Sequence, residues 1–375
     1  MSTNRGAAGS PLTWGLALLF LVPIDVAITR TPLLWGPTSY ENTHDLRLVQ
    51  LAETYKTARK LYAPERPARV RVALLGDSRL WFAAHEPYVE RQLRRRAPEL
   101  DVRVDTLAVF GALIGDMEVI SRHLDRQAPS VVVLAIGGQE LVPTADGELQ
   151  HWPARLLSVG WRDGPLPPAS QAERLDRWLR TVWPLYRFHE FARAALADRI
   201  FPGTPAGRPL PDHFSSSREV FDYFRTAQAP EVEAAYRAWR EHPSLPAFLD
   251  YVLVGHPLLP WRPRVAGDAR PDARALEVLD ALLGRLRRQR TAAFVLLLPE
   301  NPLLDLDTAG EYHSPGFSDR VADAVRAVAA RQGIRVVDGR RWMPAEAFYD
   351  LLHLMPDLSG FQEPLAEEIL RALRG

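Results

Sequence analysis

The sequence predicts an α/β protein in which one parallel sheet is covered by helices on both faces. Near-continuous apolar runs lie at 70–75, 102–109 and 130–138, with helical patterns between them. The alternation stops at about 151 and returns from about 272 to the end of the chain. Strands that are apolar on both faces are typical of parallel sheets, because helices then cover each side.

Helices and strands are predicted to alternate along the chain on both sides of the interruption. Residues 41–63 place Leu48, Leu51, Tyr55, Ala58 and Tyr62 three or four positions apart, which predicts an amphipathic helix. The elements that follow are a strand over 70–75, a helix over about 86–97, a strand over 102–109, a helix over about 114–127 and a strand over 130–138. Beyond the interruption we expect a helix over 272–289, a strand over 291–298, a helix over 318–331, a strand over 334–338 and a helix over about 361–373.

The interruption at about 151–270 has a different composition. It holds 15 of the 32 prolines and six of the ten tryptophans, so loops and short helices are expected there in place of strands. We interpret it as a helical insertion, a subdomain or lid, within one α/β domain of residues 70–375. Its tryptophans are expected to form the core of that subdomain more readily than to stack on sugar rings.

The N-terminal region carries one long apolar stretch, from Pro11 to Thr29, broken only by Asp25. A membrane-spanning helix needs about 17–25 apolar residues. We therefore expect a transmembrane signal anchor within residues 1–30, a helical linker over 31–69, and a domain exported to the periplasmic or extracellular side. A cleaved signal peptide and a buried core helix are the alternatives.

Composition excludes several classes of function. The 46 basic and 46 acidic side chains cancel, which leaves no overall field to attract nucleic acid. The chain has no cysteine, so disulfides, thiolate catalysis and cysteine-ligated zinc are excluded. Its ten histidines contain no His-x-x-x-His pair, and no glycine-rich phosphate loop is present. We expect no metal and no cofactor. The basic run at 91–99 is expected to be a solvated helix face.

Two short motifs could carry chemistry. Gly76, Asp77 and Ser78 follow the first strand, at the edge of a parallel sheet where ligands bind. Ser78 can therefore be a nucleophile, or Asp77 and Ser78 can simply cap a helix. Near the C-terminus, Asp350-x-x-His353 offers an imidazole base and a carboxylate to orient it.

Together these motifs resemble the SGNH/GDSL hydrolase superfamily, over about 70–140 and 272–375. The resemblance implies a flavodoxin-like three-layer α/β/α fold. It implies that Ser78 is the nucleophile, with its own N–H as an oxyanion donor. It further implies that His353 is the base and Asp350 its partner, just before the closing helix.

The other two motifs of this family are an oxyanion glycine and an oxyanion asparagine. Gly111, after the second strand, matches the glycine, and Gly115 is a weaker match. The family's Gly-x-Asn-Asp corresponds to residues 137–140, where Gln139 and Glu140 are each one methylene longer. The resemblance assigns the Gln139 amide as an oxyanion donor, and a polar turn is the alternative for this pair.

The resemblance, with the predicted anchor, implies an acyl-ester hydrolase or O-acyltransferase. Its substrate would be an acylated cell-envelope glycan or lipid, and a membrane acyltransferase could be its partner. The sequence does not separate hydrolase from transferase. The alternative is a catalytically weak or inactive SGNH-fold protein that serves as a glycan-binding or assembly module. Gln139 favours this alternative, whereas the combination of Ser78, Asp350 and His353 favours the enzyme.

Three polar residues outside these motifs are further candidates for the site. Glu300 and Asn301 follow the predicted strand 291–298 and could line the pocket or form a turn before Pro302. His313 is expected on a surface loop.

Overall fold

The computed structural model describes the α/β domain and parts of the rest of the chain. The described residues are 23, 54, 56–57, 60–61, 68–124, 128–143, 149, 171–183, 186, 234–235, 237–239, 241–242, 244, 246–247, 270–306, 316–348, 352–355 and 360–375. The chain divides into two compact units, residues 1–38 with 158–204, and residues 39–157 with 205–375. All five strands and the site described below belong to the second unit, and helix α8 (Gln171–Val182) belongs to the first.

The second unit is built on a five-stranded parallel sheet with the order β2-β1-β3-β4-β5. Its strands are β1 (Val70–Gly76), β2 (Val102–Ala108), β3 (Val131–Ile136), β4 (Ala292–Leu297) and β5 (Arg335–Asp338). This is the flavodoxin-like order, in which the chain crosses to the other side of β1 after β2. The loops that follow β1 and β3 therefore meet at the switch point, where ligands bind in such sheets.

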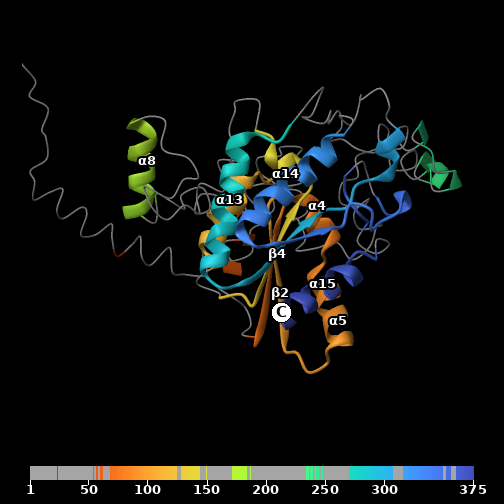
Figure 1. The fold of residues 1–375 in the computed structure, drawn as a ribbon, viewed down its shortest axis with the longest axis horizontal. Helices are drawn as coiled ribbons and strands as arrows, with labels where there is room; N and C mark the ends of the chain where they lie inside the picture. Colours follow the sequence, from red (N-terminus) through yellow and green to blue (C-terminus); the bar gives the residue numbers. More distant parts are fainter. Residues whose placement is uncertain are drawn as a thin grey trace, which may run out of the picture. The chain divides into compact units, whose positions relative to one another are not determined.

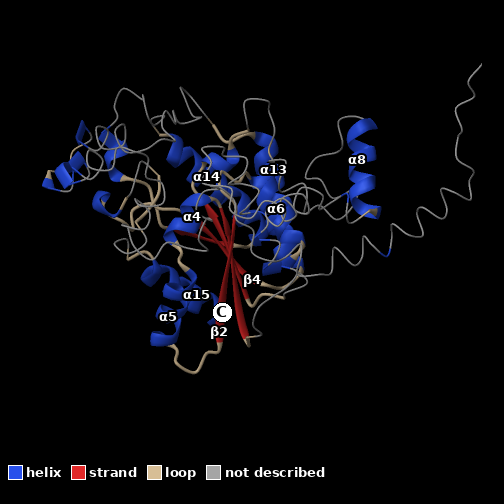
Figure 2. Ribbon diagram, turned by 180° about the vertical axis from the view of Figure 1, so that it is seen from behind, coloured by secondary structure: helices blue, strands red, loops and turns tan. Residues whose placement is uncertain are grey.

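Helices cover both faces of this sheet (Figures 1 and 2). On one face lie α4 (Ser78–Ala83), α5 (Glu86–Arg96) and α15 (Gln362–Arg374). On the other lie α6 (Ile114–Arg122), α13 (Ala273–Arg288) and α14 (Phe317–Gln332). The described part of this unit also contains the short 3-10 helices η2 (Gln139–Leu141), η3 (Pro302–Leu306) and η4 (Ala345–Ala347).

Most residues of the central strands are apolar because both faces of the sheet are buried, although β2 also buries Arg103, Asp105 and Thr106. Every residue of β2 and β3 is buried, and alternate residues of β1 face the two helix layers. The face under α5 and α15 holds Val72 and Leu74, packed with Leu365 and Ile369 of α15. Each such buried aliphatic side chain contributes about 1.5–3 kcal/mol.

Local signals explain where the main helices begin and end. The Asp272 carboxylate accepts hydrogen bonds from the N–H groups of Arg274 (2.8 Å) and Ala275 (3.2 Å) and so caps α13. Arg287 and Arg288 lie in its last turn, where cations interact favourably with the helix dipole. Helix α14 ends at Gly333, whose φ of 64° favours glycine.

The structure confirms the parallel α/β sheet with helices on both faces that the sequence predicts. The strands and helices agree with the predicted ranges to within a few residues, apart from the helix over 114–127, which ends at Arg122. Arg94 and Arg95 of the basic run are exposed, as expected for a solvated helix face.

Several predictions fall on residues that are largely outside the described part. These are the anchor at 11–29, the helix over 41–63 and most of the insertion at about 151–270. Among the described residues, no helix combines the length and the apolar character needed to cross a bilayer.

Candidate active site

The loop after β1 separates the two interpretations of Asp77 and Ser78. Asp77 is the helix cap: its Oδ1 accepts a hydrogen bond from the Arg79 N–H at 2.9 Å. Ser78 is the first residue of α4, and its side chain is partly exposed. Because the neighbouring carboxylate caps the helix, the Ser78 hydroxyl is left to interact elsewhere.

That interaction is with His353. Ser78 Oγ and His353 Nε2 lie 2.8 Å apart, within hydrogen-bond distance, although 275 residues separate them in the sequence. With the ring proton on Nδ1, the hydroxyl donates to Nε2, the arrangement needed for a base to activate a hydroxyl. Both residues are partly exposed, so a substrate can approach them.

The segment that carries His353 is fixed on both sides. Phe348 and Leu354 form an isolated antiparallel bridge, and the Met355 N–H donates to the Ala347 carbonyl at 2.7 Å. The three apolar side chains Phe348, Leu354 and Met355 are almost completely buried. Asp350 lies outside the described residues, so its predicted role as partner of His353 stays a prediction.

Aromatic side chains hold the imidazole from one side. The Phe82 ring lies 4.9 Å from the His353 ring, centroid to centroid, and is only 4% exposed. Phe82 packs in turn against Trp81 at 5.0 Å and Phe110 at 5.9 Å. This cluster joins α4 to the loop after β2. The apolar run that follows Ser78 therefore also supports the histidine, because its Phe82 ring packs against the imidazole.

A further contact ties the C-terminal segment to α4. The Gln362 side-chain amide, at the start of α15, donates to the Ala83 carbonyl at the end of α4, at 2.8 Å. Gln362 is 6% exposed, so this hydrogen bond is shielded from water. The helix that begins at Ser78 is thus also joined to α15, the helix that follows His353 in the sequence.

Arg79 forms a buried polar network directly behind Ser78. Its Nε donates to Asp77 Oδ2 at 2.9 Å, its Nη1 donates to the Gly137 carbonyl at 3.0 Å, and its Nη2 pairs with Glu140. Glu140 Oε2 also accepts a hydrogen bond from the Gly137 N–H at 3.1 Å. The network therefore connects the loop after β1 to the loop after β3.

Burial decides the electrostatics of this network. Burial raises the pKa of Glu140 to about 7, against the attraction of the Arg79 guanidinium, and the Asp77 charge adds to the increase. Burial alone would lower the pKa of Arg79, but attraction to Asp77 and Glu140 outweighs it, so the pKa lies above its ordinary value. Arg79 therefore stays charged.

The predicted oxyanion donors lie in loops on either side of β1. Gly111 sits in the turn after β2 with a φ of 66°, next to Phe110 of the aromatic cluster. Gln139 begins η2 after β3 and is partly exposed. The Gly115 N–H donates to the Leu149 carbonyl at 2.9 Å and is therefore engaged elsewhere.

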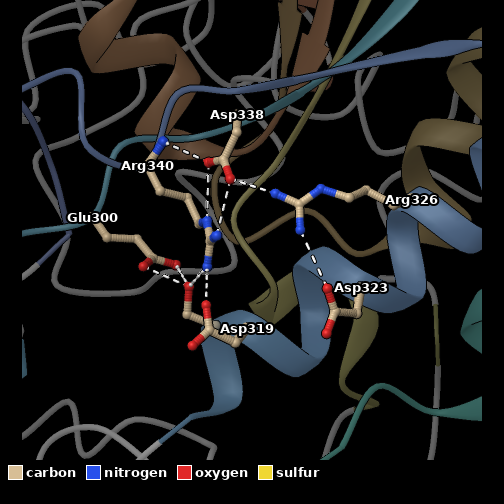
Figure 3. Close-up of polar contacts among 7 residues, drawn as sticks. Glu300, Asp319, Asp323, Arg326, Asp338 and Arg340 are labelled. Atoms are coloured by element: carbon tan, nitrogen blue, oxygen red, sulfur yellow. Dashed lines mark hydrogen bonds and ion pairs between the residues drawn. The ribbon is translucent and has the colours of Figure 1, made fainter.

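Glu300 and Asn301 have structural partners. Asn301 Oδ1 accepts a hydrogen bond from the Leu303 N–H at 3.0 Å, which is the turn predicted as the alternative to a pocket role. The Glu300 carboxylate accepts from Ser318 Oγ, at 2.5 Å and 2.6 Å to its two oxygens, in the polar cluster of Figure 3. His313 lies outside the described residues.

Sequence reasoning did not assign roles to Arg79, Phe82 or Gln362. One signal was present: Arg79 is a single charge at the start of the otherwise apolar run Leu80–Ala84. A charge in such a run needs a buried counter-charge. No group of three or more histidine or acidic side chains in the described part of the chain could hold a metal.

Comparisons with known proteins identify a similar solved structure. No protein-family model matches the chain, and no curated protein matches it. Among solved structures, it is similar to LAE5, an alpha/beta hydrolase enzyme from the metagenome of Lake Arreo, Spain. The two share 13% sequence identity with a TM-score of 0.37, over 82% of this chain and 97% of that chain. A likeness of this size does not bear on the reaction.

Proposed function

We propose that this protein is a serine-dependent acyl-ester hydrolase or O-acyltransferase of the SGNH/GDSL type. The observation that carries the proposal is the 2.8 Å contact between Ser78 Oγ and His353 Nε2. It lies at the carboxyl edge of a parallel sheet, after the strand beside the switch point. The strand order and the positions of the four motifs, after β1, β2 and β3 and before α15, support membership of this family.

The chemistry follows from these groups. His353 Nε2 takes the Ser78 proton as Oγ attacks the ester carbonyl, and the carbonyl oxygen becomes an oxyanion. The N–H groups of Ser78 and Gly111 and the Gln139 amide would donate hydrogen bonds to that oxyanion. The carbonyl then re-forms, the C–O bond to the alcohol breaks, and the imidazolium protonates the departing oxygen.

The second half of the reaction releases the acyl group from Ser78. A water or an acceptor hydroxyl attacks the acyl-serine carbonyl while His353 takes its proton. Ser78 Oγ is then expelled and regains a proton from His353. Water gives a hydrolase and a second hydroxyl gives a transferase, with the same protein groups in both cases. Asp350 would orient His353 and stabilise its charged form.

The proposed substrate and location are supported by the sequence alone. The apolar stretch from Pro11 to Thr29 supports anchoring by one N-terminal helix, with the domain on the exported side. An acylated envelope glycan or lipid is then the substrate class within reach, and a membrane acyltransferase is a fitting partner. No nucleic acid and no cofactor enter this proposal.

The proposal is tested with a fluorophosphonate probe and with p-nitrophenyl acetate on the full-length protein in detergent. Wild type is expected to be labelled and to release p-nitrophenol, whereas Ser78→Ala and His353→Ala should lose at least about 10³-fold in rate. Labelling without turnover would identify a transferase that lacks its acceptor. A folded wild-type protein that neither labels nor turns over would contradict the proposal and favour the binding-module alternative.

A further inference from the structure

Both backbone polar groups of Gly137 are held by buried charged side chains. Its N–H donates to Glu140 Oε2 at 3.1 Å, and its carbonyl accepts from Arg79 Nη1 at 3.0 Å. The Arg79 side chain is 5% exposed and the Glu140 side chain is not exposed at all. Charge-assisted hydrogen bonds in a low-dielectric setting are strong and directional, so the two peptide groups that flank the Gly137 Cα have little freedom to rotate.

Glycine at this position leaves room for the guanidinium, which lies against the backbone. A Cβ on Gly137 would lie 1.8 Å from Arg79 Nη1, far inside contact distance. Gly138 follows with a φ of 98°, and Gln139 then begins η2. The held backbone at Gly137 therefore constrains the direction in which the chain enters Gln139.

The same guanidinium is attached to the nucleophile loop. Arg79 is the residue after Ser78, and its Nε and backbone N–H both donate to Asp77, each at 2.9 Å. One side chain thus contacts the loop of the nucleophile and the loop of a predicted oxyanion donor. Movement of either loop would break a buried ion pair or leave a buried carbonyl unpaired, and both are costly.

We propose that Arg79 and Glu140 are positioning residues of this active site, which fix the backbone at Gly137 so that Gln139 is held in register with Ser78. The inference rests on the proposed function. Neither side chain touches the substrate in this account. They act by reducing the freedom of an oxyanion donor, whose effect depends on its placement in the transition state.

The length of Glu140 fits this role. Its carboxylate reaches both the Arg79 guanidinium and the Gly137 N–H. An aspartate would be one methylene shorter and could not satisfy both groups in the present backbone. The longer side chain at this position, a departure from the family pattern, therefore has a physical reason.

The test compares Glu140→Gln with a matched control, Glu118→Gln, in the full-length protein. Glu118 is also buried, at 2% exposed, and pairs with Arg122 at 2.9 Å and with Arg285 on the opposite helix layer from α4. Both variants remove a buried negative charge facing arginine, but only one of them adjoins Gly137. Thermal unfolding of each variant shows whether the fold is retained.

With p-nitrophenyl acetate, Glu140→Gln is expected to lower kcat by about 10–100-fold with little change in KM, as for a weakened transition-state interaction. Glu118→Gln should lower the unfolding temperature but leave kcat within about twofold of wild type, as for a mutation remote from the chemistry. If the folded Glu140→Gln protein keeps the kcat of the Glu118→Gln control, the proposal is wrong.

Glu140→Asp keeps the charge and serves where Glu140→Gln does not fold. It should also lower kcat by about tenfold or more, since the shorter side chain loses one of its two partners. A wild-type kcat in this variant would also overturn the proposal. Labelling of the variants at Ser78 without a kcat difference would refute only the positioning role. A wild-type protein that neither labels nor turns over would refute the proposed function itself.

Discussion

The sheet carries the same local arrangement twice at its carboxyl edge, with different consequences. Asp77-x-Arg79 follows β1 and Asp338-x-Arg340 ends β5. In both, the arginine N–H and Nε donate to the aspartate, at 2.9 Å each in the first pair and at 3.2 Å and 3.0 Å in the second. The intervening residue is Ser78 in one and Gly339 in the other.

The surroundings of the two aspartate–arginine pairs differ in burial. Arg79 and Glu140 are buried, whereas Arg340 pairs with Asp319, whose side chain is 78% exposed (Figure 3). The pKa of Glu140 is raised by burial, whereas hydrogen bonds from Arg340 hold the pKa of Asp338 below its ordinary value. The comparison teaches that the short motif sets the local geometry, while its depth in the fold decides whether burial or hydrogen bonding dominates the pKa of a carboxylate that faces the arginine.

Removal of each arginine should give the largest difference between the two sites, measured as the loss in the free energy of unfolding. Arg79→Met leaves Glu140 and Asp77 buried without a counter-charge, and we expect it to lower the free energy of unfolding by about 3–5 kcal/mol. Arg340→Met should lower it by only about 1 kcal/mol, because its partners are open to water. Urea unfolding of both variants measures this difference, and equal losses would show that depth does not matter.

The two carboxylates should also give opposite slopes of stability with pH. The folded pKa of Glu140, about 7, exceeds its ordinary value of 4.5, so its stabilising contribution is complete below 4.5 and is lost as the pH rises through 7. Asp338 has a lowered pKa, so its contribution is present above its ordinary value of 3.8 and is lost as the pH falls through the folded value.

Unfolding measured across pH 3–8 in Glu140→Gln and Asp338→Asn separates these contributions. The first variant should lose the decrease between about pH 4.5 and 7, and the second should lose part of the decrease in acid. A Glu140→Gln protein with the wild-type slope above pH 4.5 would mean that the attraction of Arg79 outweighs burial.

The sheet could be predicted because the strands have recognisable local sequence patterns. Val131–Ile136 is apolar throughout and Val70–Leu75 is apolar except for Arg71, a pattern typical of strands that are covered on both faces. Ser78 and His353 could be singled out because hydroxyl, carboxyl and imidazole groups followed a strand or preceded the last helix. Their 2.8 Å contact required the fold, which brings the two ends of the domain together.

The supporting residues could not be predicted, because their roles depend on distant partners. The role of Arg79 depends on its contact with Glu140, 61 residues away in the sequence. The role of Phe82 depends on the imidazole against which it packs. A pattern of single residues does not show which charges will be buried together. Gln139 and Glu140 looked like a departure from a motif, and only the Arg79 contact gives the longer carboxylate a reason.

The most direct test of the central claim is to trap the acyl group on the protein. The full-length wild type is mixed with p-nitrophenyl acetate, quenched in acid within the first turnover, digested and analysed by mass spectrometry. The account predicts one acetyl ester on the peptide that contains Ser78, absent from Ser78→Ala and from His353→Ala. An acetyl group that stays in the Ser78→Ala protein, or a folded wild type with none on this peptide, would contradict it.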